Sequence, residues 1–179
     1  IKPSVGLDPA ATAAMVDDLA AGGIDFIKDD ELQSDGPACP FEARVDAVMA
    51  VLNRHADRLG RKIMFAFNLT GDLDEMRRRH DYLLARGGTC IMVSLHSVGF
   101  VGVTELARHS QLPVHAHRNG WGALSRAPLL GWDFPAWQVV ATGHFRTDIP
   151  LQRYGANERR RAEALLARFG LADKRDEYP

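Results

Sequence analysis

The stretch Gly23-Ile24-Asp25-Phe26-Ile27-Lys28-Asp29-Asp30-Glu31 (GIDFIKDDE, residues 23–31) joins an apolar strand directly to a lysine and three consecutive carboxylates. Side chains alternate across a β-strand, so we expect Lys28 and Asp30 on one side of it and Asp29 on the other. Glu31 falls where the strand gives way to a loop. Crowded carboxylates are unfavourable unless they bind something, so the pattern predicts a cation site at this strand end.

Lys28, Asp30 and Glu31 form a candidate set of magnesium ligands. Mg²⁺ prefers oxygen ligands, keeps several waters and takes few protein carboxylates. A lysine joins such a set only when its neutral amine captures carbon dioxide as a carbamate, an anionic oxygen ligand that a nearby metal stabilises. The structural alternative is a salt-bridged strand end, because ion pairs that serve folding also cluster lysines with carboxylates.

The composition is that of a globular protein with one ordinary core: 179 residues, 46% hydrophobic and 25% charged. A net charge of -1 argues against nucleic-acid or membrane-surface partners. No apolar run reaches the length of a membrane span. Cys39 and Cys90 have no metal-binding spacing and fit a reducing cytoplasm. Because the chain starts without Met and inside an expected strand end, we expect it to be a piece of a longer protein.

Short strands and helices alternate along the chain, which predicts βαβ units around a parallel sheet in an α/β fold. Asp8 is the expected N-cap of the first helix, and Asp72 and Glu75 have capping-box spacing. The expected strands cover residues 1–2, 24–28, 63–68, 89–93 and 113–116, and the expected helices cover residues 9–21, 41–59, 73–85 and 103–109.

Polar residues gather at or just beyond the carboxyl ends of the expected strands. In (β/α)8 barrels this rim carries the active site. An open doubly wound sheet is the alternative, but no glycine-rich phosphate-binding motif follows the first strand. Taken singly, Asn68 would be a turn residue, His96 a loop histidine and Arg118 a surface charge. The rim set is Lys2, Lys28, Asp30, Glu31, Asn68, His96, His117 and Arg118.

Three motifs follow one another: KPSVGL at residues 2–7, the stretch at residues 23–31, and HAHR at residues 115–118. In order, spacing and strand position they resemble the large subunit of ribulose-bisphosphate carboxylase (RuBisCO) and the RuBisCO-like proteins. The resemblance covers about residues 1–138 and implies a TIM-type (β/α)8 barrel, of which this chain would supply about five βα units. Residues 139–179 do not match the family and form an unassigned helical tail.

The resemblance implies Mg²⁺ as cofactor and carbon dioxide bound as a carbamate on Lys28, with Asp30 and Glu31 as the other protein ligands. The family's chemistry begins by removing a proton next to a ketone, which gives an enediolate whose charge the metal stabilises. The carbamate would act as base. Lys2 would donate or accept a proton at the other carbon.

Substrate contacts are also implied by the resemblance. His117 would be a catalytic residue at the substrate, and Arg118 would bind a phosphate group, for which its planar fork is suited. Asn68 would bind substrate as well. The expected substrate is a phosphorylated keto sugar or keto sugar acid, and the expected assembly is a homodimer whose partner completes each site.

Departures from the carboxylase pattern argue against carbon fixation. Ser4 stands where the carboxylase has a second lysine, and residues 93–100 differ at the exit of the fourth strand. Residues 118–122 and 128–134 are similar instead to RuBisCO-like proteins of the group that acts on oxidised branched sugar acids such as 3-oxo-isoapionate phosphate.

Three alternatives stay open: a fragment of an authentic carboxylase, an inactive truncated product, and a Schiff-base aldolase barrel with Lys28 or Lys2 as nucleophile. The carboxylates of Asp30 and Glu31 disfavour the aldolase, because they would hold the lysine protonated. Five strands do not close an eight-stranded barrel. We therefore expect this chain alone to expose strand edges, to associate and to lack turnover.

Overall fold

The computed structural model describes residues 1 and 6–120, and within them helices and strands alternate as predicted. The predicted tail at residues 139–179 and the predicted boundary at residue 138 lie outside the described residues. Compactness divides the chain into two units, residues 1–131 and 132–179. The helices are α1 (Pro9–Ala21), α2 (Phe41–Leu59), α3 (Leu73–Ala85) and α4 (Leu95–His109), and the strands are β1 (Phe26–Lys28), β2 (Met64–Asn68), β3 (Cys90–Ser94) and β4 (Val114–His117).

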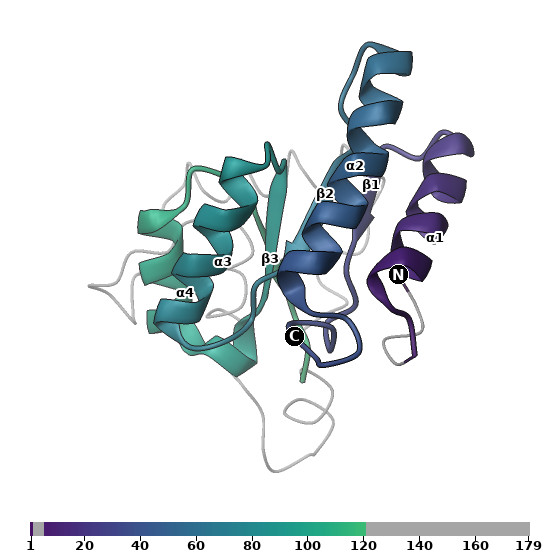
Figure 1. Ribbon diagram of the computed structural model, residues 1–179. Helices are drawn as coiled ribbons and strands as arrows, with labels where there is room; N and C mark the ends of the chain where they lie inside the picture. The colour runs from purple at the N-terminus through teal and green to yellow at the C-terminus, as the bar shows by residue number, and fades with distance from the viewer. Residues whose placement is uncertain (2–5, 121–179) are drawn as a thin grey trace, which may run out of the picture. The chain divides into compact units, whose positions relative to one another are not determined.

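The four strands form one parallel sheet in the order β1-β2-β3-β4, with the helices packed in front of it in Figure 1. β1 and β4 are its two edges, yet the ring of Phe26 in β1 lies 5.5 Å from that of His115 in β4. Contact between opposite edges requires a strongly curled sheet. The fold is therefore a parallel half-barrel, the arrangement predicted for part of a (β/α)8 barrel.

The expected first strand, residues 1–2, is only partly described. The amino group of Ile1 donates a hydrogen bond of 2.8 Å to the carbonyl of Lys28, so the start of the chain lies beside the end of β1. Lys2 itself lies outside the described residues.

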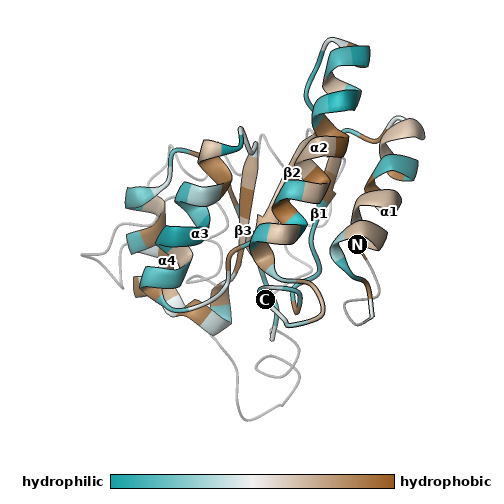
Figure 2. Ribbon diagram, viewed as in Figure 1, coloured by the Kyte–Doolittle hydropathy of each residue, from teal (hydrophilic) through white to brown (hydrophobic). Residues whose placement is uncertain are grey.

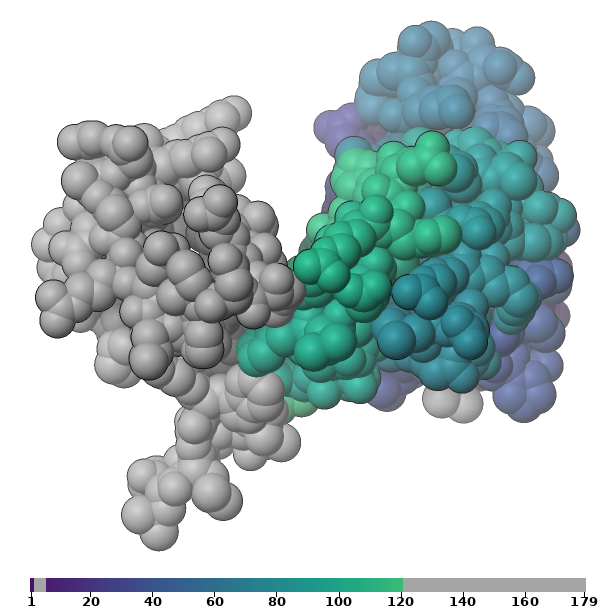
Figure 3. All heavy atoms as spheres, turned by 90° about the vertical axis from the view of Figure 1, so that its left-hand side faces the viewer, coloured from purple at the N-terminus to yellow at the C-terminus, as the bar shows by residue number. Residues whose placement is uncertain are grey.

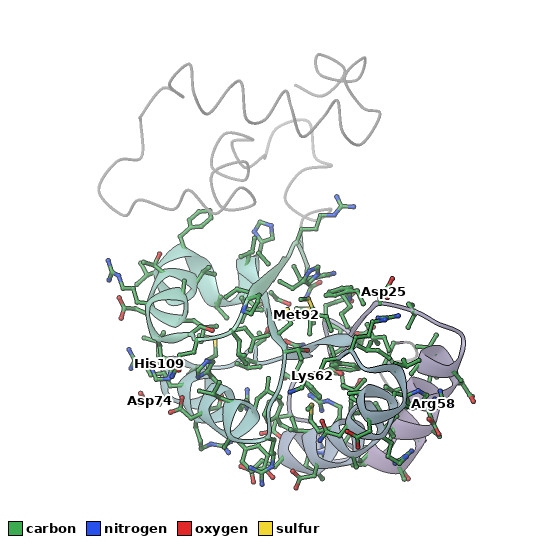
Figure 4. All side chains as sticks on the ribbon, turned by 90° about the horizontal axis from the view of Figure 1, so that it is seen from above. Asp25, Arg58, Lys62, Asp74, Met92 and His109 are labelled. Atoms are coloured by element: carbon green, nitrogen blue, oxygen red, sulfur yellow. The ribbon has the colours of Figure 1, made fainter. Side chains whose placement is uncertain are left out.

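The two faces of the sheet have different partners. On the outer face, Phe67 of β2 packs edge-on against Phe41 of α2, with ring centroids 6.5 Å apart. On the inner face, the side chains of Ala66, Cys90 and Met92 form a buried cluster. Figure 2 shows the strands as largely hydrophobic, while the helices carry their polar residues outward, and Figure 4 shows Met92 in the interior. The centre of the inner face is thus buried.

Local signals set the helix ends. Asp8 accepts a hydrogen bond of 2.7 Å from the backbone of Ala11, as its predicted N-cap role requires. Asp72 and Glu75 form the predicted capping box of α3. α2 ends at Gly60, whose φ of 67° lies in the left-handed region that glycine adopts most readily. None of the helices among the described residues is long and apolar enough to cross a membrane.

Helix α4 starts earlier than its sequence predicts. It begins at Leu95, directly after β3, rather than at Val103. Gly99 interrupts it with a φ of 70°, which divides α4 into one short turn and a longer helix. The apolar periodicity of the sequence is visible only in the part of α4 that follows Gly99. Figure 3 shows the side of the molecule on which α3 and α4 lie. His96, predicted at the rim with a loop histidine as the structural alternative, lies in the first turn of α4.

Candidate active site

Three of the predicted site residues meet at the carboxyl ends of β1 and β4. Nζ of Lys28 lies 3.6 Å from Oε2 of Glu31, and the same carboxylate oxygen lies 3.9 Å from Nε2 of His117. Nζ of Lys28 also donates to the carbonyl of Asp29 at 3.0 Å. All three side chains are partly exposed. The curl of the sheet therefore creates a charged site that a solute can reach.

Asp29 lies on the other side of β1, as the strand alternation predicts. Its side chain is fully buried, and its Oδ2 accepts hydrogen bonds from Nε of Arg44 at 3.2 Å and from the backbone N–H of Asn68 at 2.9 Å. Burial raises the pKa of Asp29, and the charge of Arg44 opposes that rise. Asp29 therefore forms a buried structural ion pair with Arg44 and stands apart from the predicted ligands Lys28, Asp30 and Glu31.

Asp30 and Glu31 form a turn with its own hydrogen bonds. Oδ1 of Asp30 accepts from the backbone N–H of Leu32 at 2.9 Å, and the carbonyl of Asp30 accepts from that of Gln33 at 3.1 Å. Nδ2 of Asn68 donates to the carbonyls of both Asp30 and Glu31, each at 3.1 Å. The backbone that carries the two predicted metal ligands is thus tied to the end of β2.

The side chain of Asn68 is fully buried and bonded on both sides of its amide. Besides the two donated bonds, its Oδ1 accepts from the backbone N–H of Thr70 at 3.1 Å and from the hydroxyl of Thr70 at 2.7 Å. That hydroxyl oxygen in turn accepts from the backbone N–H of Ser94 at 3.0 Å. Asn68 therefore links the carboxyl ends of three strands, and its contacts are to the protein itself.

The pKa of His117 lies below the usual value for histidine. Burial lowers its pKa below the usual value, and the positive charges of Lys28 and Arg118 lower it further. The carboxylates of Glu31 and Asp30 oppose that change without cancelling it. A neutral imidazole at this position has a nitrogen that can accept a proton.

The structure also describes the predicted rim residues Arg118 and His96, and His115 of the motif at residues 115–118. The ring of His115, which the motif contains but which received no predicted role, lies 6.2 Å from that of His117, and burial lowers its pKa. Arg118 directly follows β4. His96 lies beside Gly120, where an added Cβ would be 3.6 Å from Cβ of His96. Burial lowers the pKa of His96 as well.

The sequence reasoning missed Arg44, which is fully buried behind the acidic turn. A signal for it existed, since Arg44 occupies the apolar face of α2 between Phe41 and Val48, where a charge requires a buried partner. Strand alternation separates Asp29 from Lys28 and Asp30, but the pairing of Asp29 with Arg44 depends on how α2 packs against β1.

A second cluster, His80, Asp81 and His109, lies between α3 and α4, and Figure 4 labels His109 there. Oδ1 of Asp81 is 2.8 Å from both Nδ1 of His80 and Nε2 of His109. The backbone N–H of Gln111 donates to Nε2 of His80 at 3.2 Å, so the proton of that ring lies on Nδ1. A metal ion on Nδ1 would require a proton on Nε2, facing that N–H. The cluster therefore links two helices by hydrogen bonds.

Comparison with known proteins agrees with the motifs. Residues 1–142 match the family model for the ribulose bisphosphate carboxylase large chain, catalytic domain. The chain is 68% identical over 140 residues to the 3-oxo-isoapionate-4-phosphate transcarboxylase/hydrolase of Xanthobacter autotrophicus, an alignment that covers 78% of this chain and 34% of the relative. It is 44% identical over 139 residues to the 3-oxo-isoapionate-4-phosphate decarboxylase of Rhizobium etli, covering 77% of this chain and 33% of that relative.

A solved structure gives the same result for the fold. The crystal structure of a RuBisCO-like protein from Burkholderia fungorum matches with a TM-score of 0.75 and 47% sequence identity, over 79% of this chain and 35% of the other. The chain spans about a third of the length of the curated relatives it matches. With its parallel half-barrel and its charged rim, it belongs to the family of the RuBisCO large chain catalytic domain and resembles the RuBisCO-like proteins within it.

Proposed function

We propose that this chain carries the metal-binding half of the active site of a RuBisCO-like enzyme that removes a proton next to the ketone of a phosphorylated keto sugar acid. The observation that carries this proposal is the approach of the Lys28 amine to the Glu31 carboxylate, beside the neutral His117. The relative named as acting on 3-oxo-isoapionate 4-phosphate, 68% identical to this chain, supports the class of substrate.

The residues present fit a magnesium ion with a lysine carbamate. Asp30 and Glu31 supply carboxylate oxygens on a turn that Asn68 holds in place. The amine of Lys28 is partly exposed, so carbon dioxide can reach it, and a carbamate there would place a third anionic oxygen beside Glu31. When bound, the ion would stabilise the negative charge that develops on the substrate oxygens as the proton leaves.

The chain's own residues would supply the remaining roles in proton transfer and substrate binding. The carbamate on Lys28 would be the base, and the neutral imidazole of His117 would move a proton at the substrate. Arg118 would bind the phosphate. Lys2, outside the described residues, keeps its proposed role in acid/base chemistry. Asn68 would act by positioning the acidic turn, because its amide is already bonded to the protein.

The reaction outcome and the assembly are also proposals. The two relatives are named as a transcarboxylase/hydrolase and a decarboxylase of the same substrate. Loss of carbon dioxide from the carbon next to the ketone would leave the bonding electrons as the same kind of enolate that proton removal gives, so a bound ion would stabilise the charge in both cases. We propose that the whole protein is a cytoplasmic homodimer that does not use ribulose bisphosphate. A homodimer by light scattering and turnover of a phosphorylated keto sugar acid, but not of ribulose bisphosphate, are the expected results.

Carbamate formation tests the proposal on this chain directly. ¹³C NMR of the chain with labelled bicarbonate and Mg²⁺ should show a carbamate signal that is lost in Lys28→Ala and weakened by EDTA. Lys62→Ala is the matched control, because the Lys62 amine donates to the Gly87 carbonyl at 3.4 Å and is not a member of the candidate ligand set. Figure 4 shows Lys62. A signal that survives Lys28→Ala would contradict the proposal.

A further inference from the structure

Arg44 is fully buried, and each nitrogen of its guanidinium donates a hydrogen bond to the acidic turn or to the loop that follows it. Nε donates to Oδ2 of Asp29 at 3.2 Å. Nη2 donates to the carbonyls of Gln33 and Ser34 at 3.2 and 2.8 Å, and Nη1 donates to the carbonyl of Cys39 at 2.9 Å. The rigid guanidinium therefore holds Asp29, which precedes Asp30, and the backbone of Gln33 and Ser34, which follow Glu31.

The contact extends from Asp29 to the site side of the strand. The carboxylate oxygen that Arg44 binds also accepts from the backbone N–H of Asn68, which fixes where Asn68 lies. The side-chain amide of Asn68 then holds the carbonyls of Asp30 and Glu31. Three successive hydrogen bonds thus connect Arg44 to the backbone carbonyls of Asp30 and Glu31.

We propose that Arg44 is a positioning residue for the metal-binding turn, which fixes the separation of the Asp30 and Glu31 carboxylates without touching metal or substrate. The inference rests on the proposed function. A planar guanidinium with donors in fixed directions sets the distance between its acceptors, whereas an ammonium group does not. Residues that orient metal ligands in this way typically change metal affinity by about 10- to 100-fold when replaced.

Arg79 provides a matched comparison. It is also buried, and its guanidinium carbon lies 6.0 Å from the centroid of the Phe41 ring, compared with 5.4 Å for Arg44. Within the part of the chain that the structure describes, Arg79 donates to the carbonyls of Leu69 and Thr70 and to the carboxylates of Asp35 and Glu75, not to the Asp29, Gln33 and Ser34 acceptors that Arg44 binds. A purely structural need for buried arginine at this end of the sheet would apply to both residues.

The experiment measures Mn²⁺ binding to the 179-residue chain in bicarbonate buffer, from the free Mn²⁺ signal in electron paramagnetic resonance. The main variant is Arg44→Met with Asp29→Asn, which removes both buried charges and keeps an oxygen for the Asn68 N–H. The control is Arg79→Met with Asp35→Asn. Circular dichroism establishes that each variant is folded.

We expect Arg44→Met/Asp29→Asn to weaken Mn²⁺ binding by about 10-fold or more, and the Arg79 control to change it by less than about threefold. Arg44→Lys keeps the charge, so it should fold, but it should not restore affinity. Equal affinity in the main variant and the original chain, or an equal loss in the Arg79 control, would overturn the positioning role. Failure of the original chain to bind Mn²⁺ would instead overturn the proposed function on which it rests.

Discussion

Asp29 and Glu31 stand two residues apart in one acidic run, yet they lie in opposite environments. Asp29 is fully buried against Arg44 on the side of α2, whereas Glu31 is partly exposed on the inner face between Lys28 and His117. The difference teaches that the turn is held from its outer side. Glu31, which is partly exposed, need not stabilise the fold, so its carboxylate can carry charge where a ligand binds.

The largest expected effect is on the outer side. Arg44→Met leaves the Asp29 carboxylate buried without its cation, and breaking a buried ion pair in this way costs about 3–5 kcal/mol of folding free energy. The measurement is the free energy of unfolding of the chain in urea. Adding Asp29→Asn should recover most of the loss, since no uncompensated charge remains. A loss below about 1 kcal/mol for Arg44→Met would mean that water reaches this pair.

A smaller effect is expected at the link between the two sides. Asn68→Ala removes two donors to the acidic turn and the acceptor for Thr70, which should cost about 1–3 kcal/mol. Hydrogen exchange at the backbone N–H groups of Leu32 and Gln33 should become faster, because Asp30 accepts both bonds. Asn53→Ala, at an exposed position of α2, is the control and should leave these rates unchanged.

The contribution of His117, on the inner face, should be visible in how the stability of the chain depends on pH. The pKa of His117 is lower in the folded chain than the usual value of about 6.5, so below that pH the unfolded chain binds more protons. Stability therefore rises with pH through the range just below 6.5, and falls on acidification. His117→Asn should flatten this slope in urea titrations at several pH values. An unchanged slope would assign the effect to His115 or His96, whose pKa values are also lowered by burial.

Much of the fold could be predicted because its signals are local. Asp8 and the Asp72–Glu75 capping box mark helix starts, and strand alternation alone separates Lys28 from Asp29. The start of α4 was predicted wrongly, since Gly99 hides the short first turn from any periodicity. Local signals are sufficient where a residue's neighbours in sequence are also its neighbours in space.

The site was predictable in its location but not in its support. Lys28, Glu31 and His117 meet because carboxyl ends of parallel strands share one rim. Arg44 and the four bonds of the Asn68 amide depend on how α2 packs behind β1 and on the register of β2, which no short pattern encodes. The residues that hold a site are therefore harder to find from sequence than those that face its ligand.

The smallest stability effect is expected at Glu31, where the contrast with Asp29 is sharpest. Glu31→Gln removes one charge from a partly exposed ion pair with Lys28, so unfolding should change by less than about 1 kcal/mol. Asp25→Asn, which breaks the exposed pair with Arg61, is the control and should change stability equally little. The two variants should differ in Mn²⁺ binding, which only Glu31→Gln should weaken, because Asp25 is far more exposed and belongs to no ligand set. If Glu31→Gln instead destabilised the chain as much as Arg44→Met, the inner carboxylate would be a structural group too, and the division between the two sides of the turn would fail.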